Sequence, residues 1–377
     1  MSSPLVQIAP NAPSERLLRL KRQFVHLPRA PRYLLPVLQH GTPVKWANIA
    51  LVETELLLRR TKLKSFPFYY FVDPCNVCNL RCPLCPTGNY TLDRNQGMMS
   101  FATFKSIIDQ IKRYALTVGV YNLGEPFLNR QIFDMIEYAQ ANNIGTNLSS
   151  NFNWPVPVDV RDIVRSGLEY ITVSLDGLTQ ETYSRYRVNG DVKEVFENMK
   201  ALLAAREAMH SKTPVVEWQF IVFEHNEHEL PQVKQLAKQL GVDRLRLVPP
   251  TIPPELVGDQ TVAAQWLPHD PVYRENDPRL AEQRGYIHDE ACFYLYRTMR
   301  VDPDGSVAPC CYARSKTHTF GNLLEHSLEQ IWNNESYQSA RMLFGRKSLP
   351  QDRTPVFCDL CPMYKRSALP NNGLSCR

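Results

Sequence analysis

Four cysteines within eleven residues constrain this chain more than any other feature. They lie in the stretch CNVCNLRCPLCP, with the spacing Cys75-x2-Cys78-x3-Cys82-x2-Cys85. Only three residues separate Cys78 from Cys82, whereas two facing zinc knuckles usually need about a dozen or more between their CxxC pairs. Thiolates at the spacing C-x3-C-x2-C can instead line one loop and hold three irons of a [4Fe–4S] cluster, which leaves the fourth iron without a protein ligand.

Composition and compartment favour metal ligation over disulfides for these thiols. The chain has 377 residues and ten cysteines, and is 44% hydrophobic and 21% charged, which suits one large globular domain with a smaller one. The start, MSSPLVQIAPNAPSER, lacks the order of a signal peptide, and no run approaches the roughly 18 apolar residues of a membrane span. We therefore expect a cytoplasmic protein without a membrane span, in which thiols stay reduced.

Short apolar runs alternate with amphipathic segments six times, which predicts an α/β fold. The alternation favours a parallel sheet with right-handed crossovers. Six units without a seventh or eighth predict a partial (β/α)6 TIM-like barrel. The predicted strands are FYYFVD (68–73), VGVYNL (118–123), IGTNLSS (144–150), YITVSLDG (170–177), VVEWQFIVF (215–223) and RLRLVPP (244–250).

Composition shifts divide the chain into four parts: an extension over 1–66, the barrel over 67–250, a linker or capping loop over 251–290, and a cluster-binding domain over 291–377. The extension holds 11 Lys and Arg against 3 acidic residues. We expect a mostly helical segment with Leu and Val packed on one face. Its charge is also compatible with an anionic membrane surface or a phosphorylated substrate, but no RNA-binding signature is present, so nucleic acid is not expected.

The first cysteine motif follows the first predicted strand, and in this context it resembles the radical S-adenosylmethionine (SAM) superfamily. Leu84 departs from the aromatic residue often found before the last cysteine. The resemblance implies that Cys78, Cys82 and Cys85 hold a SAM-binding [4Fe–4S] cluster, with Cys75 as a neighbour that is not a ligand. Zinc or a plain ferredoxin-like centre is the alternative.

A second motif, YNLGEPFLN, ends the second predicted strand and is similar to the GGE motif of that family. Leu123 replaces the first glycine, while Gly124 and Glu125 remain. By resemblance this segment receives the SAM amino group, for which a carboxylate is a suitable partner. The alternative is a turn with an exposed Glu.

Polar residues follow two further strands, at the edge where parallel barrels carry their active sites. Such residues also terminate strands and cap helices for structural reasons. By resemblance they lie near the ribose or methionine end of SAM, and an arginine in the following YSRYR pairs with the SAM carboxylate. The candidates are Asn151, Ser174, Asp176 and Arg187, with Arg185 as a weaker choice for the arginine.

The C-terminal part carries the other six cysteines and too few apolar residues for an independent core, so a metal is expected to stabilise it. It contains a hairpin signal in RTMRVDPDGSVAP and one predicted helix around 327–345. The spacing C-x12-G-x4-C through Gly305 resembles the opening of the SPASM domain, an auxiliary iron–sulfur module. The implied ligands of an auxiliary [4Fe–4S] cluster are Cys292, Cys310, Cys358 and Cys361.

This part departs from the full SPASM pattern, because no cysteine follows Cys361 until Cys376. It therefore looks like the shortened "twitch" form with one auxiliary cluster. Cys311 or Cys376 could replace one of the four ligands. Four thiolates around zinc fit the spacing equally well.

The resemblance implies reductive cleavage of SAM to a 5′-deoxyadenosyl radical that abstracts a hydrogen atom from the substrate. The electron is expected from a reductant such as flavodoxin or ferredoxin. An auxiliary cluster with four protein ligands has no iron free for substrate, which favours a role as electron acceptor. The prediction is a two-electron oxidation (dehydrogenation) of a small polar, phosphorylated or sugar-like molecule.

Three alternatives remain open for function. One is a peptide maturase of the RiPP type, although seven prolines before residue 44 argue against a winged leader-binding domain. Another is a redox-neutral epimerase or decarboxylase, with Cys75 or Cys311 as hydrogen donor. The last is a non-catalytic iron–sulfur or zinc protein.

Overall fold

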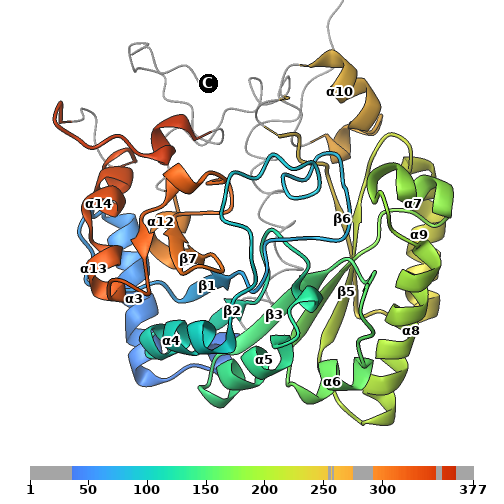
Figure 1. The fold of residues 1–377 in the computed structure, drawn as a ribbon, viewed down its shortest axis with the longest axis horizontal. Helices are drawn as coiled ribbons and strands as arrows, with labels where there is room; N and C mark the ends of the chain where they lie inside the picture. The colour runs from blue at the N-terminus through green and yellow to red at the C-terminus, as the bar shows by residue number, and fades with distance from the viewer. Residues whose placement is uncertain (1–35, 254–255, 257–258, 275–291, 345–349, 362–377) are drawn as a thin grey trace, which may run out of the picture.

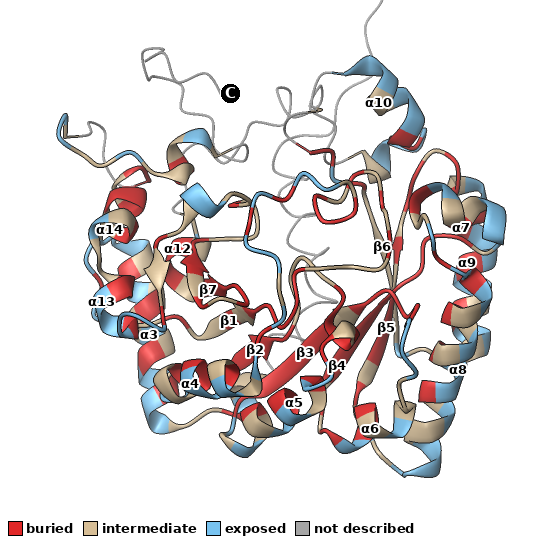
Figure 2. Cartoon of the chain, viewed as in Figure 1, coloured by how far each residue is buried: buried red, intermediate tan, exposed pale blue. Residues whose placement is uncertain are grey.

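The computed structural model describes residues 36–253, 256, 259–274, 292–344 and 350–361. One nine-stranded sheet forms its centre, in the order β6-β5-β4-β3-β2-β1-β7-β8-β9 (Figure 1). Helices cover one face of this sheet, and most strand residues are buried (Figure 2). Among the described residues, no helix is long and apolar enough to cross a membrane.

The first six strands are parallel and follow chain order across the sheet, as the alternating sequence pattern predicts. Each lies within its predicted run, except that β2 begins one residue earlier. The strands are β1 (Tyr69–Val72), β2 (Thr117–Gly119), β3 (Gly145–Ser150), β4 (Tyr170–Ser174), β5 (Val215–Ile221) and β6 (Arg244–Val248).

Amphipathic helices pack on the convex face because each presents an apolar stripe to the sheet. In α4 (Phe101–Ile111), the Ser100 hydroxyl caps the first turn by accepting from the Thr103 amide, and the buried stripe includes Phe104, Ile107 and Ile108. The other helices of this layer are α5 (Ile132–Ala141), α6 (Val160–Arg165), α7 (Gln180–Tyr186), α8 (Val192–Ala208) and α9 (Leu230–Leu240).

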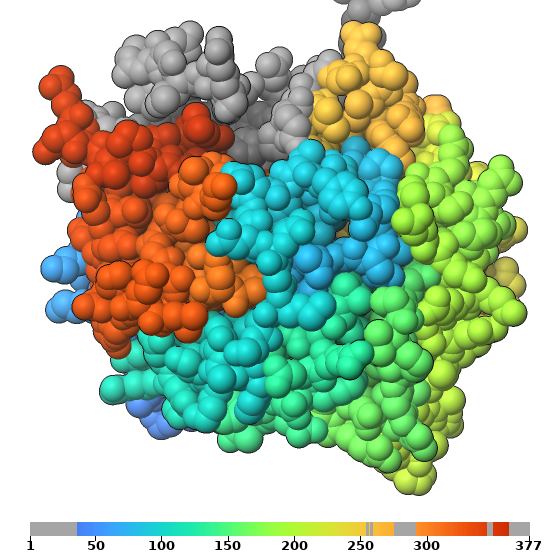
Figure 3. Space-filling model, in the orientation of Figure 1, coloured from blue at the N-terminus to red at the C-terminus, as the bar shows by residue number. Residues whose placement is uncertain are grey.

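The sheet continues into the C-terminal part of the chain. Strand β7 (Thr298–Val301) pairs in parallel with β1, and β8 (Ser306–Ala308) and β9 (Gly321–Asn322) follow as antiparallel strands. The predicted hairpin is thus confirmed as β7–β8, but it extends the barrel sheet. In Figure 3, the orange C-terminal residues lie directly against the cyan segment that precedes α4.

The single helix predicted around 327–345 is wrong, because two helices occupy its place. Helix α13 (Leu328–Trp332) ends at Asn333, and α14 (Glu335–Met342) begins after Asn334. The Asn334 side chain accepts from the Tyr337 amide, so it caps the second helix.

The predicted linker contains helix α10 (Gln260–Trp266) and a 3-10 turn, η5 (Pro271–Tyr273). Its residues 275–290 lie outside the described residues. A short helix, α12 (Tyr294–Arg297), leads from this region into β7.

Residues 43–57 of the N-terminal extension form helix α3 (Pro43–Leu57), whereas residues 1–35 lie outside the described residues. The expected Leu and Val face is confirmed only in part: Val52 is buried and Leu56 packs against the core, but Leu57 is 82% exposed. Most of the buried residues are polar, because this helix binds backbone groups. The Glu55 carboxylate accepts from the amides of Lys64 and Ser65, and from the Ser65 hydroxyl at 2.6 Å.

Replacing Glu55 by Ala should therefore destabilise the protein. The change leaves the Ser65 amide and hydroxyl, which are buried, and the partly buried Lys64 amide without their acceptor, and we expect a loss of about 3 kcal/mol in the free energy of unfolding. Glu53→Ala on the same helix removes a half-exposed ion pair with Arg297 and should change stability by less than about 1 kcal/mol. Denaturant unfolding of both variants checks the difference, and equal losses would contradict the role of Glu55.

Candidate functional site

The three cysteines predicted to hold the SAM-binding cluster, Cys78, Cys82 and Cys85, lie in the loop between β1 and α4. Cys82 is buried, while Cys78 and Cys85 are half-buried. Burial is the largest cause that raises the pKa of Cys78 to about 11 and that of Cys82 to about 12, and charge on Cys85 contributes to both shifts. The structure therefore brings the three sulfur atoms within electrostatic reach of one another. A bound cation would be needed to hold them as thiolates at neutral pH.

Hydrogen-bond donors from three segments point at these sulfur atoms. The Leu80 amide nitrogen lies 3.4 Å from Cys78 Sγ, and Asn151 Nδ2 lies 3.7 Å from the same atom. Arg187 Nη1 lies 3.9 Å from Cys82 Sγ. Donors around sulfur stabilise thiolate and influence the potential of an iron–sulfur cluster.

Gly124 lies against the cysteine loop so closely that a side chain has no room. A Cβ there would meet Cys75 O at 2.0 Å and Val77 O at 2.6 Å. The Glu125 amide donates to Val77 O at 2.9 Å. The Gly–Glu segment thus supports the backbone that leads to Cys78.

The Glu125 carboxylate is buried at the end of β3. It accepts from the Ser150 hydroxyl at 2.7 Å, from the Asn151 amide at 2.8 Å and from the Phe127 amide at 3.3 Å. Burial raises its pKa to about 7, despite these donors. Glu125 and Asn151 therefore lie together beside Cys78.

Asp176 and Arg187 form a buried ion pair next to Cys82. Arg187 Nε donates to Asp176 Oδ2 at 2.6 Å, and the Ile221 amide donates to Asp176 Oδ1 at 2.6 Å. Burial raises the pKa of Asp176, and Arg187 opposes the rise. Both carboxylate oxygens are engaged, so Asp176 positions the guanidinium. Ser174 is buried at the end of β4, and Arg185 is exposed on α7.

An aromatic cluster packs against the loop that carries Cys82. No pattern in the sequence indicated this cluster. The rings of Tyr186 and Phe223 lie 4.4 Å apart, and Trp266 contacts both edge-on. These rings share one apolar cluster with Cys82 and Leu84. Trp266 comes from the predicted linker, which thus caps the loop, and its position in an acidic and proline-rich stretch offered no periodic signal.

The cysteines of the second set, in the C-terminal part, also lie close enough to influence one another electrostatically. Burial raises the pKa of Cys292 to about 11 and that of Cys310 to about 12, and burial raises that of Cys358 well above its usual value. Charge on Cys361 raises all three. Cys311 adds to the rise for Cys292 and Cys310, so it also neighbours this set. Cys376 lies outside the described residues.

The donor chemistry of both sets fits iron–sulfur clusters. Each set consists of thiols, which are the usual ligands of [4Fe–4S] clusters. In the part of the chain that the structure describes, no three or more His, Cys, Asp or Glu are placed to hold a single metal ion. Of the two predicted hydrogen donors, Cys75 is fully buried, and its thiol donates to Val77 O at 3.4 Å. Cys311 lies beside the Tyr294 hydroxyl.

A cavity of about 750 Å³ opens on the concave face of the sheet, between the strands, α3 and α12. Its floor is polar, whereas barrel interiors are usually filled by branched apolar residues. Arg246 donates to Glu217 at 2.6 Å, and the Tyr170 hydroxyl donates to the same carboxylate at 2.6 Å. The aromatic lining residues are Phe68, Tyr69, Phe71, Tyr121, Phe293 and Tyr294, and the polar ones include Ser149, Thr172, Gln219, Arg246 and Thr298.

Comparison with protein families agrees with this geometry. Residues 72–246 match the radical SAM superfamily, and residues 292–362 match the SPASM iron–sulfur cluster-binding domain. The chain belongs to the radical SAM superfamily. It is thus an enzyme whose cofactors are SAM, a [4Fe–4S] cluster and an auxiliary iron–sulfur cluster.

Several characterised proteins are similar to this radical SAM enzyme. It is 24% identical to the tungsten-containing aldehyde ferredoxin oxidoreductase cofactor-modifying protein of Pyrococcus furiosus, over 79% of this chain and 89% of that one. It is 23% identical to the PqqA peptide cyclase of Gluconobacter oxydans, over 72% and 78% of the two chains. The crystal structure of Streptococcus suis SuiB bound to precursor peptide SuiA shares its fold, with a TM-score of 0.55 and 15% identity over 78% of this chain and 69% of that one.

Gly124→Ala should remove the SAM-binding cluster selectively. The added methyl group would push the backbone of Cys75 and Val77 away and displace Cys78, so we expect iron only at the auxiliary site. Gly97→Ala is a matched control, because a Cβ at Gly97 meets nothing within 4 Å. Iron analysis and EPR after anaerobic reconstitution distinguish the two variants. Full iron content in Gly124→Ala would show that the close approach is not required.

The predicted contact of Glu125 with the SAM amino group implies a pH-dependent affinity. Since the pKa of Glu125 is raised to about 7, the carboxyl is mostly protonated at pH 6 and mostly ionised at pH 8. We expect SAM to bind more tightly as the pH rises through this range. Glu125→Gln should bind SAM roughly tenfold or more weakly at pH 8 and lose the dependence. Anaerobic calorimetry measures both, and a wild-type affinity independent of pH would contradict the contact.

Proposed function

We propose that this radical SAM enzyme is a peptide maturase, which oxidises a side chain of a peptide held in the concave cavity. When bound, SAM and its cluster supply the 5′-deoxyadenosyl radical that removes a hydrogen atom from the substrate. The role of the chain is to place one C–H bond near that radical and to exclude others.

The cavity is the observation that carries this proposal. Its aromatic lining suits the apolar surface of an amino-acid side chain, and its polar floor offers hydrogen-bonding groups to a peptide backbone or amide. Tyr121 and Tyr294 supply aromatic surface, while Gln219 and Arg246 supply the polar groups. The cavity is open to solvent, so a longer chain can extend beyond it.

The similarity to a peptide cyclase and to maturases also supports a peptide as substrate. The PqqA peptide cyclase and the mycofactocin maturases MftC of mycobacteria are 22–24% identical over at least two thirds of this chain. They favour the peptide alternative over oxidation of a sugar-like molecule.

Within the proposal, each cysteine set has one role. Cys78, Cys82 and Cys85 hold the SAM-binding cluster. Gly124, Glu125, Asn151, Ser174 and Arg187 contact SAM, and Asp176 holds Arg187 in place. Cys292, Cys310, Cys358 and Cys361 hold the auxiliary cluster, which accepts the electron that makes the net reaction an oxidation. Cys311, beside the cavity-lining Tyr294, is the better placed of the two thiols for hydrogen donation.

The second candidate is dehydrogenation of a small polar molecule, as the sequence analysis favours. The Arg246 guanidinium in the cavity lining supports it, because a guanidinium can donate hydrogen bonds to the hydroxyl groups of a sugar or cyclitol.

The deciding experiment measures 5′-deoxyadenosine formed by anaerobically reconstituted enzyme with SAM and dithionite. A library of short synthetic peptides is compared with a panel of aminocyclitols and sugar phosphates. We expect stimulation by peptides, with a peptide product two hydrogen atoms lighter. The variant with Cys78, Cys82 and Cys85 replaced by Ala should form neither product. Stimulation by cyclitols or sugars alone would favour the second candidate.

Variants at Ser149 connect the cavity to the substrate. Ser149→Phe places a large ring in the cavity and should strongly reduce peptide modification, while SAM cleavage without substrate continues. Ser149→Ala, at the same position, should remain active. Full peptide modification by Ser149→Phe would place the substrate elsewhere.

A further inference from the structure

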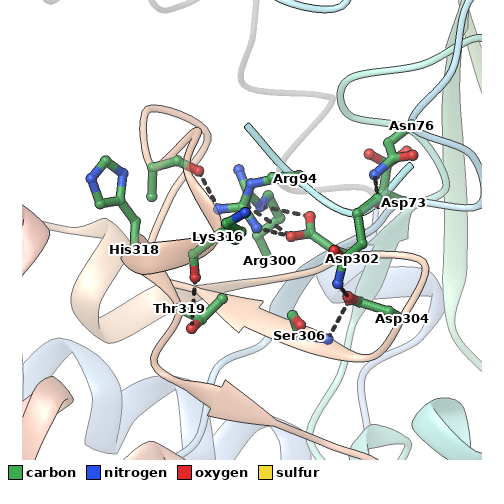
Figure 4. Close-up of polar contacts among 12 residues, drawn as sticks. Asp73, Asn76, Arg94, Arg300, Asp302, Asp304, Ser306, Lys316, His318 and Thr319 are labelled. Carbon is green, nitrogen blue, oxygen red and sulfur yellow. Dashed lines mark hydrogen bonds and ion pairs between the residues drawn. The ribbon is translucent and has the colours of Figure 1, made fainter. Parts of the chain in front are cut away.

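Two buried arginines meet behind the auxiliary cysteines, one from each half of the protein. Arg300 lies on β7, and Arg94 lies in the segment between the first cysteine loop and α4. Figure 4 shows both guanidinium groups turned toward the carboxylate of Asp302. Neither arginine was singled out by the sequence, because a lone arginine in a strand or loop has no pattern.

Arg300 faces the auxiliary cysteines directly. Its side chain is 1% exposed, and its Nη1 donates to Cys310 O at 3.3 Å. Burial lowers its pKa, but charges on Asp73, Cys310 and Cys311 act in the opposite direction. Its guanidinium therefore lies within electrostatic reach of a predicted cluster ligand and of the next cysteine.

Asp302 and Arg94 hold this guanidinium in place. Arg300 Nη2 donates to Asp302 Oδ2 at 3.2 Å, and Arg94 Nη1 donates to the same oxygen. Arg94 Nη2 also donates to Ala313 O, three residues after Cys310. Further carboxyl groups act on this pair: charge on Asp73 raises the pKa of both arginines, and charge on Asp304 and Asp93 raises that of Arg94. Two guanidinium groups thus share the Asp302 carboxylate, and Arg300 is the one on which Cys310 and Cys311 act electrostatically.

Buried hydrogen-bond donors remain unused at this site. Among the described residues, Arg94 Nε and the Tyr337 hydroxyl are buried without a hydrogen-bond partner, whereas Arg300 Nε, which also forms no hydrogen bond, lies 3.2 Å from Asp302 Oδ1. Tyr337 is fully buried and interacts electrostatically with Cys358, Cys310 and Arg300. Leaving such donors unsatisfied destabilises the folded protein. Thiolate and sulfide atoms of a bound cluster would be suitable acceptors.

We propose that Arg300, held by Asp302 and Arg94, is a positioning residue that raises the reduction potential of the auxiliary cluster, with Tyr337 as a second donor. A [4Fe–4S] cluster with four thiolates is anionic and gains one further negative charge when it takes up an electron. A buried positive charge and hydrogen bonds stabilise the reduced form more than the oxidised form. The higher potential favours electron acceptance from a substrate radical. That consequence rests on the proposed function, whereas the potential itself does not.

The test is a potentiometric EPR titration without substrate, in the full-length chain with Cys78, Cys82 and Cys85 replaced by Ala. Only the auxiliary cluster then contributes to the signal. Arg300→Gln should shift its reduction equilibrium at least tenfold toward the oxidised form, which corresponds to about 59 mV for one electron. Arg300→Lys keeps the charge and should restore most of the potential.

Arg341→Gln is the matched control. Arg341 is also fully buried in the C-terminal part, but it donates to Leu295 O and Thr61 O and stacks on Trp332. It also lies over the ring of Tyr337, but no cysteine is among the groups that shift its pKa. Its replacement removes an equal charge and should shift the potential much less than Arg300→Gln does. An equal shift of the potential in both variants would show that the loss of any buried charge has this effect, which would overturn the proposal.

Tyr337→Phe keeps the ring packing and removes one donor, so it should lower the potential less than Arg300→Gln does. If Arg300→Gln loses the auxiliary iron while Arg341→Gln retains it, the positioning role of Arg300 is supported. The effect on the reduction potential is then measured in Tyr337→Phe and Arg300→Lys. An unchanged potential in an Arg300→Gln variant that carries the auxiliary cluster overturns the proposal. If Arg300→Gln does not bind the cluster, an unchanged potential in both Tyr337→Phe and Arg300→Lys overturns it.

Discussion

The parallel pairing of β1 with β7 is the interaction on which the rest of this structure depends. Tyr69 is opposite Thr298 and Val72 opposite Val301, and the Asp73 amide then donates to Val301 O at 2.8 Å. The first cysteine loop leaves the sheet just after Asp73, while the hairpin that leads to Cys310 leaves it just after Val301. Cys78 and Cys310, more than 200 residues apart in the chain, thereby lie in segments that follow strands of the same part of the sheet.

Pairing with β1 also explains how a part with little apolar core of its own is stabilised. Strands β7 and β8 bury Met299, Val301 and Val307 in the same hydrophobic cluster that contains the barrel strands. Residues of the cysteine loop then bind the hairpin from the other side: Asn95 donates to Asp304 at 2.9 Å, and Asp93 accepts from the Ser315 hydroxyl at 2.6 Å. The two cluster regions therefore share one sheet and one hydrophobic core.

Alternation along the parallel strands separates the two faces of the sheet. Residues such as Tyr70 and Val72 face the helices and are fully buried, while Tyr69 and Phe71 line the cavity. Since side chains point to opposite faces in turn, the strands can present a polar surface to a substrate without weakening the core. Helix α3 completes the cavity with Ile49 and Glu53, and its polar buried face fastens it to the backbone.

Local patterns in the sequence determined the strands, most of the helices and the cysteine spacing. Period and composition act over a few residues, so FYYFVD or the α4 stripe can be identified without tertiary information. The Gly–Glu segment and Arg187 were predictable for the same reason, because they belong to short motifs. The break at Asn333–Asn334 was not, since its capping bond outweighs a continuous helical pattern.

Only the tertiary structure decided which distant residues meet. The β1–β7 pairing, the cavity floor, the Tyr186–Phe223–Trp266 cluster and the Arg94–Asp302–Arg300 network all join segments that are remote in the chain. Such contacts depend on long-range strand pairing and on the burial of charge, and neither leaves a periodic trace in the sequence. The sequence by itself determined that the chain can bind two iron–sulfur clusters, while the fold decided what surrounds them.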